Sequence, residues 1–460
     1  MEYEEFLKQK DYVLESSGFD IEKSELNPRM FEFEKDIVRW ALKKGRACIF
    51  AGCGLGKTLC QLEWSYRIHL RTGSNVLIVA PLTVADQTKR EAEKFGYAVK
   101  VCESQEDCID GINITNYEKL EKFVANKFVA VVLDESSILK SYTGKVRNQI
   151  IDMFSQTPYK LACTATPAPN DYMELGNHSE FCGVMTRAEM LSMFFVHDGG
   201  QTSKWRLKGH AKNIFWQWMA TWAVFLENPK DLGYVESGYD LPPLHVKEII
   251  VDGDKPIVES LTLTERRNAR KESLELRCQA ASELVNNSDE QWIVWCDLNA
   301  ESEKLHELIY DSVEVKGSDK PKHKSDAILR FTDGEIKALV TKASIAGYGI
   351  NWQNCHNMIF TGLSDSFEAF YQAVRRCWRF GQDKEVNVYI IISAKEGCVK
   401  ENIERKQADF DAMRDAMIDL TKEITKKELR QTCRIVTPYE PQIKMELPDW
   451  EEFRNGNKCA

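Results

Sequence analysis

The chain has 460 residues, of which 43% are hydrophobic and 29% charged, and its formal net charge is −10. This length exceeds what one hydrophobic core usually serves, so two or three domains are expected. No apolar run approaches the roughly 20 residues of a membrane span, and the negative charge argues against a protein that coats nucleic acid by bulk charge. The N-terminal sequence does not show a basic stub followed by an apolar stretch, so we expect a cytoplasmic protein.

The first part of the chain alternates short β-branched apolar runs with longer amphipathic stretches. Strands are predicted at residues 47–50, 76–80, 129–133 and 160–163. This alternation is typical of parallel sheets with crossover helices. Residues 1–175 are therefore expected to form a first α/β domain.

A glycine-rich segment, AGCGLGKT at residues 51–58, follows the first of these strands and precedes a helical stretch. Its glycines are Gly52, Gly54 and Gly56. Glycines let backbone amides approach phosphate oxygens, and a following helix N-terminus favours negative charge. In this pattern Lys57 reaches the β- and γ-phosphates, and the Thr58 hydroxyl ligates Mg²⁺. The segment predicts a site for ATP and Mg²⁺.

Two adjacent carboxylates end the third predicted strand, in VVLDESS. Ligands of open α/β sheets bind at the carboxyl ends of the strands, where Asp134 and Glu135 are expected to lie. Such a pair suits divided roles, with Asp134 holding Mg²⁺ through water and Glu135 polarising the attacking water. By itself the pair is more often a surface turn. The upstream glycine-rich loop favours the catalytic interpretation.

Residues 176–244 break the alternation and are expected to form an insertion or linking subdomain that ends at a Pro-Pro pair. Its tryptophans are Trp205, Trp216, Trp218 and Trp222. Phe215, Trp218, Met219, Trp222 and Leu226 recur at helical spacing, which predicts core packing.

Basic residues occupy alternate positions in SKWRLKGHAK. They are Lys204, Arg206, Lys208, His210 and Lys212. In a strand they would all face one way and could lie along phosphates. A solvated hairpin face explains the pattern equally well.

The alternation of strands and helices resumes after this segment. Strands are predicted at residues 292–296, 338–341, 358–360 and 386–392. Residues 245–398 are therefore expected to form a second α/β domain. A C-terminal helix and tail follow at 399–460.

Three further segments carry recognisable motifs: LACTATPAPN at residues 161–170, SIAGYGINW at 344–352 and QAVRRCWRFGQ at 372–382. Together with the glycine-rich loop and the DE pair, they resemble the motifs of superfamily 2 helicases. The likeness is greatest to the remodeller-like Snf-type translocases, in a compact form reminiscent of bacteriophage proteins. It covers the chain from about residue 31 to residue 382.

The resemblance implies two tandem RecA-like domains, with parallel sheets and helices on both faces, and a DNA-dependent ATPase activity. For a phage-encoded protein, the expected compartment is the cytoplasm of the bacterial host. Arg376 and Arg379, which a helix would place on one face, become arginine fingers against the γ-phosphate. The alternative is an ordinary basic helix face. Gly349 would let the backbone approach the nucleotide. The residues implied in coupling ATP state to track binding are Thr164, Thr166 and Gln372.

The same resemblance places the nucleic-acid track on loops of both domains. The implied contacts are Thr83, Thr115, Asn116, Thr341 and Lys342, to which the alternating pattern adds Lys204, Arg206 and Lys208. Duplex DNA is favoured over RNA because the motifs read GLGKT and RxGQ. Two alternatives stay open, namely a strand-separating DNA or RNA helicase and an ATP-switched DNA-binding module that targets a DNA methyltransferase or nuclease. We expect a monomer.

One position departs from the resembled family, which usually carries an adenine-reading glutamine ahead of the first domain. In FEFEKDIVRWAL, residues 31–42, Glu34 occupies that place. An amide can accept from adenine N6 and donate to N7, whereas an ionised carboxylate can only accept. Glu34 is therefore expected to read adenine incompletely. The alternative is a surface residue at a helix start, with another group reading the base.

Overall fold

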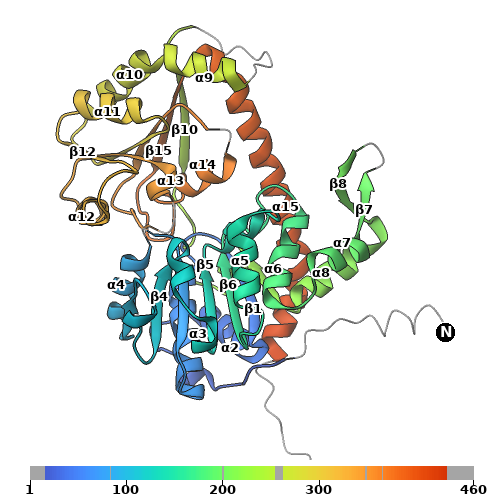
Figure 1. Ribbon diagram of the computed structural model, residues 1–460. Helices are drawn as coiled ribbons and strands as arrows, with labels where there is room; N and C mark the ends of the chain where they lie inside the picture. The colour runs from blue at the N-terminus through green and yellow to red at the C-terminus, as the bar shows by residue number, and fades with distance from the viewer. Residues whose placement is uncertain are drawn as a thin grey trace, which may run out of the picture.

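The computed structural model describes residues 16–82, 84–198, 201–253, 263–347, 350–364 and 366–431. Two lobes lie one above the other, and a long C-terminal helix runs along both of them (Figure 1). No helix in the described part of the chain combines the length and apolar character needed to cross a membrane.

The first lobe is built on a seven-stranded sheet whose paired strands are all parallel. In spatial order its strands are β3 (Val99–Val101), β4 (Ile112–Asn116), β2 (Val76–Ala80), β5 (Ala130–Asp134), β6 (Tyr159–Thr164), β1 (Arg46–Ala51) and β9 (Ala223–Leu226). Helices cover both faces. They are α2 (Glu32–Lys44), α3 (Lys57–Thr72), α4 (Ala85–Phe95) and α5 (Lys145–Met153), followed by α6 (Leu175–Cys182), α7 (Arg187–Phe194) and α8 (Lys212–Ala220).

The strands are apolar on both sides because each side packs against helices. Along β1, Ile49 packs with residues of α2 and α3, such as Trp64, in one cluster. The neighbouring Phe50 packs with α6 and α8 residues, such as Trp216, in the other. A strand that is buried on both faces appears in the sequence as a continuous apolar run. This pattern is why these strands could be predicted.

The segment at 176–244 contributes to the first lobe. Its strand β9 pairs in parallel with β1 and forms an edge of the first sheet. Phe215, Trp218 and Trp222 are buried in the core, as their spacing predicted. However, α8 ends at Ala220, so Leu226 reaches the core from a strand. The predicted domain limits at 175 and 244 stay a prediction.

A β-hairpin projects from this segment beyond the body of the first lobe (Figure 1). It pairs β7 (Phe195–Asp198) with β8 (Gln201–Leu207) in an antiparallel register. Strand β8 ends at Leu207, so it does not include the whole alternating basic set that was predicted as a strand. His210 lies in a 3₁₀ turn, and Lys212 begins α8. Only Lys204 and Arg206 of the alternating set are on the strand.

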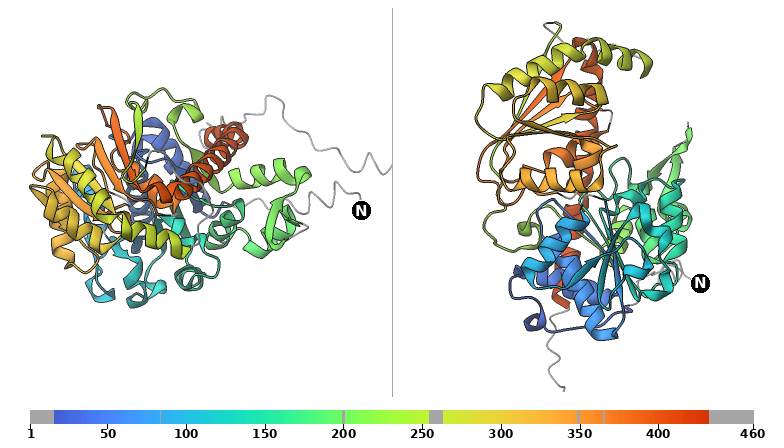
Figure 2. Two further views of the ribbon diagram at one scale, coloured as in Figure 1. Left: turned by 90° about the horizontal axis from the view of Figure 1, so that it is seen from above. Right: turned by 60° about the vertical axis from the view of Figure 1, so that its left-hand side comes forward.

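The second lobe contains a six-stranded sheet whose paired strands are all parallel. In spatial order these are β10 (Leu244–Ile250), β15 (Val386–Ile392), β14 (Asn357–Thr361), β11 (Trp292–Cys296), β13 (Ala338–Lys342) and β12 (Ser312–Val315). Its helices are α9 (Leu263–Glu272), α10 (Leu274–Asn286), α11 (Asn299–Leu308), α12 (Pro321–Thr332), α13 (Ala343–Ala346) and α14 (Phe367–Val374). Helices cover both faces of this sheet (Figure 2), and its apolar residues pack in two clusters. The predicted fold of two tandem RecA-like domains is confirmed.

The C-terminal helix α15 (Gly397–Gln431) joins the two lobes along one side. Phe410 packs in the core of the second lobe, whereas Met417 and Leu429 pack in the two core clusters of the first. Near its end, Glu428 forms an ion pair with Lys44 at 3.0 Å. The helix therefore packs against both lobes.

Candidate active site

The loop after β1 owes its shape to glycines in the left-handed region of backbone conformation. Gly54 has φ of +89° and Gly56 has φ of +66°, values that residues with side chains rarely adopt. A Cβ on Gly56 would also lie 1.7 Å from Oε1 of Glu34. Helix α3 starts directly after the loop, and a helix N-terminus attracts anions. The loop therefore forms an anion-binding cradle.

Lys57 and Thr58 open α3 beside this cradle. The Lys57 ammonium donates to the backbone carbonyls of Ala51 at 2.9 Å and Gly52 at 3.0 Å, which places it over the loop. Both residues line a cavity of about 240 Å³ between the lobes, together with Asp134 and Glu135. The structure thus brings the predicted phosphate and magnesium residues together. Their donor set fits a nucleoside triphosphate with its divalent cation.

Asp134 ends β5 and is fixed by three hydrogen bonds. Its Oδ1 accepts from Nε2 of Gln61 at 2.7 Å and from the Glu135 amide at 3.1 Å. The Tyr117 hydroxyl donates to its backbone carbonyl at 2.6 Å. Burial, aided by the Glu135 charge, raises the pKa of Asp134 to about 6. A bound cation would favour the charged carboxylate instead. Gln61 and Tyr117 carried no sequence signal for this role.

Glu135 has φ of +51°, a left-handed conformation in a residue other than glycine. Such backbone conformations cost about 1–3 kcal/mol and persist where the surroundings enforce them. Thr164 donates to Oε2 of Glu135 at 3.4 Å. The next residue, Ser136, lies 3.1 Å through its Oγ from Nε2 of His178 on α6. Burial lowers the pKa of His178 to about 4, so its imidazole is neutral. His178 was not predicted from the sequence.

A chain of hydrogen bonds crosses from the first lobe to the second. The Thr166 amide donates to Oγ1 of Thr164 at 3.1 Å. Thr166 Oγ1 accepts from Nε2 of Gln372 at 3.4 Å, and Oε1 of Gln372 accepts from Arg376 at 2.8 Å. The three predicted coupling residues therefore form one path from Glu135 to Arg376.

Arg376 and Arg379 do not share a helix face as predicted. Helix α14 ends at Val374, and the chain continues in tight turns in which the Arg376 amide donates to Ala373 at 3.2 Å. The two arginines nevertheless converge on one acceptor, because Nη1 of each donates to the Ile350 carbonyl, at 3.1 and 3.3 Å. Both line the cavity between the lobes.

Arg379 is held in this cavity as a poorly solvated cation. Burial and the nearby Arg376 lower the pKa of Arg379 to about 10, so it stays charged at neutral pH. Its Nε has no hydrogen-bond partner among the described residues. An arginine with a free donor suits charge stabilisation on a transferring phosphoryl group.

Glu34 lies in the first turn of α2 and lines the same cavity. It is 3% exposed, and its Oε2 accepts from the Phe31 amide at 2.9 Å. Burial raises the pKa of Glu34 to about 8, so the carboxyl group is largely protonated at neutral pH. Phe31 contacts Tyr239 and Phe380, with ring centroids 5.9 and 6.1 Å apart, and these rings also line the cavity. The aromatic residues were not predicted.

Arg375 lies in the same turn as the two arginines and contacts the first lobe. It forms an ion pair with Glu227, which follows β9 in the first lobe. Its guanidinium carbon lies 5.1 Å from the Trp378 ring centroid. A second pair, Lys140 with Glu368, also joins the lobes. These pairs fix the orientation of the arginine-bearing turn.

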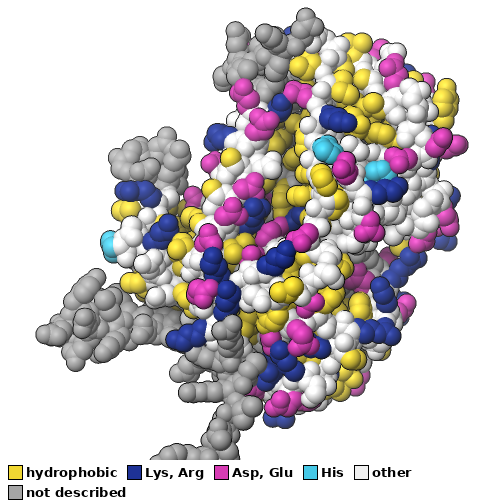
Figure 3. Space-filling model, turned by 180° about the vertical axis from the view of Figure 1, so that it is seen from behind, with side chains coloured by type: hydrophobic (Ala, Val, Ile, Leu, Met, Phe, Trp, Pro, Cys, Tyr) yellow, Lys and Arg dark blue, Asp and Glu magenta, His cyan; other side chains and the backbone are white. Residues whose placement is uncertain are grey.

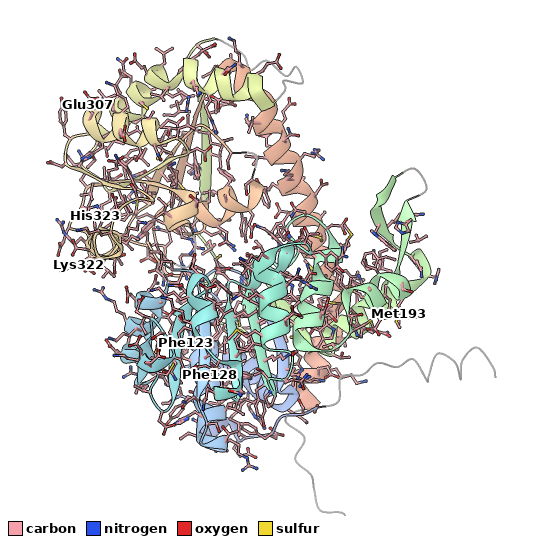
Figure 4. The ribbon with its side chains drawn as sticks, viewed as in Figure 1. Phe123, Phe128, Met193, Glu307, Lys322 and His323 are labelled. Carbon is pink, nitrogen blue, oxygen red and sulfur yellow. The ribbon has the colours of Figure 1, made fainter. Side chains whose placement is uncertain are left out.

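The predicted track residues are spread over several elements. Thr115 and Asn116 end β4, and both line a second cavity of about 390 Å³ between α4 and α12. Lys322 and His323, which Figure 4 labels, lie in the first turn of α12, and the next residues, Lys324 and Ser325, line this cavity. Thr341 is fully buried and donates to the Val315 carbonyl at 3.1 Å. Lys342 ends β13. Thr83 and Gly349 lie outside the described residues.

On the hairpin, the predicted basic residues have different surroundings. Arg206 is exposed. The Lys208 ammonium donates to the carbonyls of Ser192 at 2.9 Å and Met193 at 3.0 Å, near the end of α7. Lysine near a helix C-terminus satisfies free carbonyls. The placement of the Lys204 side chain lies outside what the structure describes.

Comparisons with known proteins found two family matches, a relative and a similar structure. Residues 24–169 match the family described as "Type III restriction enzyme, res subunit", and residues 276–381 match "Helicase conserved C-terminal domain". The TATA-binding protein-associated factor mot1 of Schizosaccharomyces pombe is 28% identical over 124 residues, which are 25% of this chain and 6% of that protein. The SWI2/SNF2 ATPase core of Sulfolobus solfataricus, solved in complex with double-stranded DNA, has a TM-score of 0.42 at 16% identity, covering 90% of this chain and 98% of that one.

The two matched families together cover more than half of the chain and contain the glycine-rich loop, the carboxylate pair and both arginines. The molecule is a two-lobed ATPase with a cavity between the lobes that residues of these motifs line. It is a helicase-related ATPase of superfamily 2.

Proposed function

We propose that the protein is a DNA-dependent ATPase that moves along duplex DNA without separating the strands. The observation that carries the proposal is the hydrogen-bonded path from Glu135 through Thr164, Thr166 and Gln372 to Arg376. Because this path crosses the lobe boundary, a change in lobe spacing alters the surroundings of the catalytic carboxylate. Such a link is what a motor needs to convert hydrolysis into movement.

In this proposal the nucleotide binds between the lobes with its phosphates on the loop from Gly52 to Thr58. Asp134 and Thr58 hold Mg²⁺, which supplies charge neutralisation for phosphoryl transfer. Glu135 orients the attacking water, and Arg376 and Arg379 stabilise the developing charge from the second lobe.

The proposed track is duplex DNA, as the GLGKT and RxGQ motifs favour. Basic and acidic side chains are interspersed over the back of the molecule (Figure 3), and the net charge is −10. DNA contact in this proposal is therefore local and relies on a few loop residues, among them Thr115 and Asn116. Such contacts to the phosphate backbone are independent of sequence.

The test is the steady-state ATPase rate with duplex DNA, single-stranded DNA and RNA as separate stimulants. Glu135→Gln serves as the background control. Stimulation by duplex DNA is the expected result. Stimulation by single strands alone would favour a strand-separating helicase, and no stimulation would favour an ATP-switched targeting module.

The matched family description names a subunit of a restriction enzyme. A DNA methyltransferase or nuclease partner is therefore retained in the proposal, with the motor itself acting as a monomer. Light scattering after size exclusion, with and without a candidate partner, tests both points.

A further inference from the structure

Glu91 is a carboxylate of the nucleotide cavity that belongs to none of the sequence motifs. It lies on α4, which follows β2, and its side chain is partly buried. It lines the cavity beside Thr58 of the first lobe and Arg379 of the second. The cavity therefore contains a fourth acidic residue on the first lobe, besides Glu34, Asp134 and Glu135.

The contacts of Glu91 reach both lobes. Its Oε1 accepts from Nδ2 of Asn351 in the second lobe at 3.2 Å. Burial raises the pKa of Glu91, and the Arg379 guanidinium is the largest opposing influence. Gln87 and Thr58 also oppose the effect of burial on this pKa. The Glu91 carboxylate thus faces the start of α3, the Asn351 amide and the Arg379 guanidinium.

The position of Glu91 is also a boundary between two cavities. Glu91, Lys94 and Asn351 line the nucleotide cavity and the second cavity, which contains Thr115 and Asn116. The Glu91 to Asn351 hydrogen bond therefore lies in the wall between them. A second hydrogen bond between the lobes joins Ser325 of α12 to Asp86 of α4 at 3.2 Å.

We propose that Glu91 is a positioning residue that sets Arg379 of the second lobe against the Thr58 end of the phosphate loop. The carboxylate attracts the guanidinium and anchors Asn351, which directly follows the Ile350 carbonyl that binds both arginines. Small displacements of a catalytic group cost much of its rate contribution. The inference rests on the proposed role of Arg379 in hydrolysis.

The test is a double-mutant cycle of Glu91→Ala and Arg379→Ala in the full chain, with kcat and KM for ATP measured in saturating duplex DNA. Glu91→Ala is expected to lower kcat about tenfold, a barrier change of about 1.4 kcal/mol, and to leave KM nearly unchanged. Because Glu91 acts through Arg379, the double variant should be no slower than Arg379→Ala alone. Glu93→Ala is the matched control, since Glu93 is an exposed carboxylate on the same helix.

Glu91→Gln extends the test if Glu91→Ala does not fold. It preserves the acceptor for Asn351 and removes the charge, so kcat should still fall. An equal fall in kcat from Glu91→Ala in both backgrounds would overturn the proposal, as would wild-type kcat in Glu91→Gln. Wild-type kcat in Arg379→Ala would instead refute the proposed role of that arginine and, with it, this inference.

Discussion

Gln372 of the second lobe donates a hydrogen bond to the Thr166 hydroxyl of the first lobe, at 3.4 Å. Thr166 in turn binds Thr164, whose hydroxyl contacts Glu135. Separation of the lobes would break this contact first, because it is the link in the path where the two lobes meet. The environment of Glu135 therefore depends on lobe spacing.

Removal of this link should reduce the response to DNA. We expect Gln372→Ala to lower the DNA-stimulated kcat about tenfold, the scale of one lost hydrogen bond to a polar group. ATP binding should change little, since Gln372 does not line the nucleotide cavity. Gln279→Ala on the exposed face of α10 is the control. Unchanged stimulation in Gln372→Ala would remove this residue from the coupling path.

Glu135 should be essential for turnover. Glu135→Gln removes the water-polarising charge but keeps the shape, so ATP binding should persist while kcat falls by at least about 10²-fold. Equilibrium nucleotide binding and steady-state turnover measure the two effects separately. Glu118→Gln, an exposed carboxylate of the same lobe, should turn over normally. Near-normal turnover in Glu135→Gln would refute the assignment.

Glu34 should give ATP binding an alkaline limit. Burial raises the pKa of Glu34 to about 8, so below pH 8 the neutral carboxyl group can both donate and accept, as an amide does. Above pH 8 it ionises and loses its donor. KM for ATP in the wild type should therefore rise by about fivefold from pH 7 to pH 9, the value of one net hydrogen bond of ~1 kcal/mol.

The matched variant for this effect is Glu34→Gln. Its KM should be close to wild type at pH 7 and should stay constant to pH 9, while Glu32→Gln at the exposed start of α2 should follow the wild-type profile. The expectation from the sequence, that Glu34 reads adenine incompletely, assumed an ionised carboxylate. Burial changes that premise. Parallel pH profiles for wild type and Glu34→Gln would place adenine recognition elsewhere.

The hairpin lysine and arginine should respond differently to substitution. Arg206→Gln should reduce the slope of the logarithm of the DNA-binding constant against the logarithm of the salt concentration. The reduction should correspond to the loss of about one phosphate contact. Lys208→Gln should leave that slope unchanged and lower the melting temperature, because its ammonium binds carbonyls near the end of α7. Binding titrations at several salt concentrations measure the slope. Equal slopes for Arg206→Gln and wild type would leave the hairpin as a solvated surface.

Much of the fold could be predicted because its strands are buried on both faces. The runs at 76–80, 292–296 and 386–392 coincide with β2, β11 and β15. Short edge strands were missed, since β3 spans only Val99–Val101 and β12 is only half-buried along most of its length. Their weak apolar patterns do not differ from those of loops.

The site residues likewise divide into those that could be predicted from the sequence and those that could not. Lys57 directly follows the glycine-rich loop, and Asp134 and Glu135 are adjacent at a strand end, so local pattern was sufficient to predict them. Glu91 and His178 act through contacts that only the folded chain creates, with Asn351 and Ser136 respectively. The turn after α14 was predicted as helix because the spacing of Arg376 and Arg379 would place them on one helix face. In the structure the two arginines meet instead at the Ile350 carbonyl.

The central claim is movement along duplex DNA, and displacement of a third strand from a DNA triplex measures it most directly. The full chain with ATP should displace the triplex-forming strand from a long duplex while the duplex itself stays paired. Glu135→Gln should fail to displace it while still binding DNA. Strand separation of the duplex, or ATP hydrolysis without triplex displacement, would contradict the account.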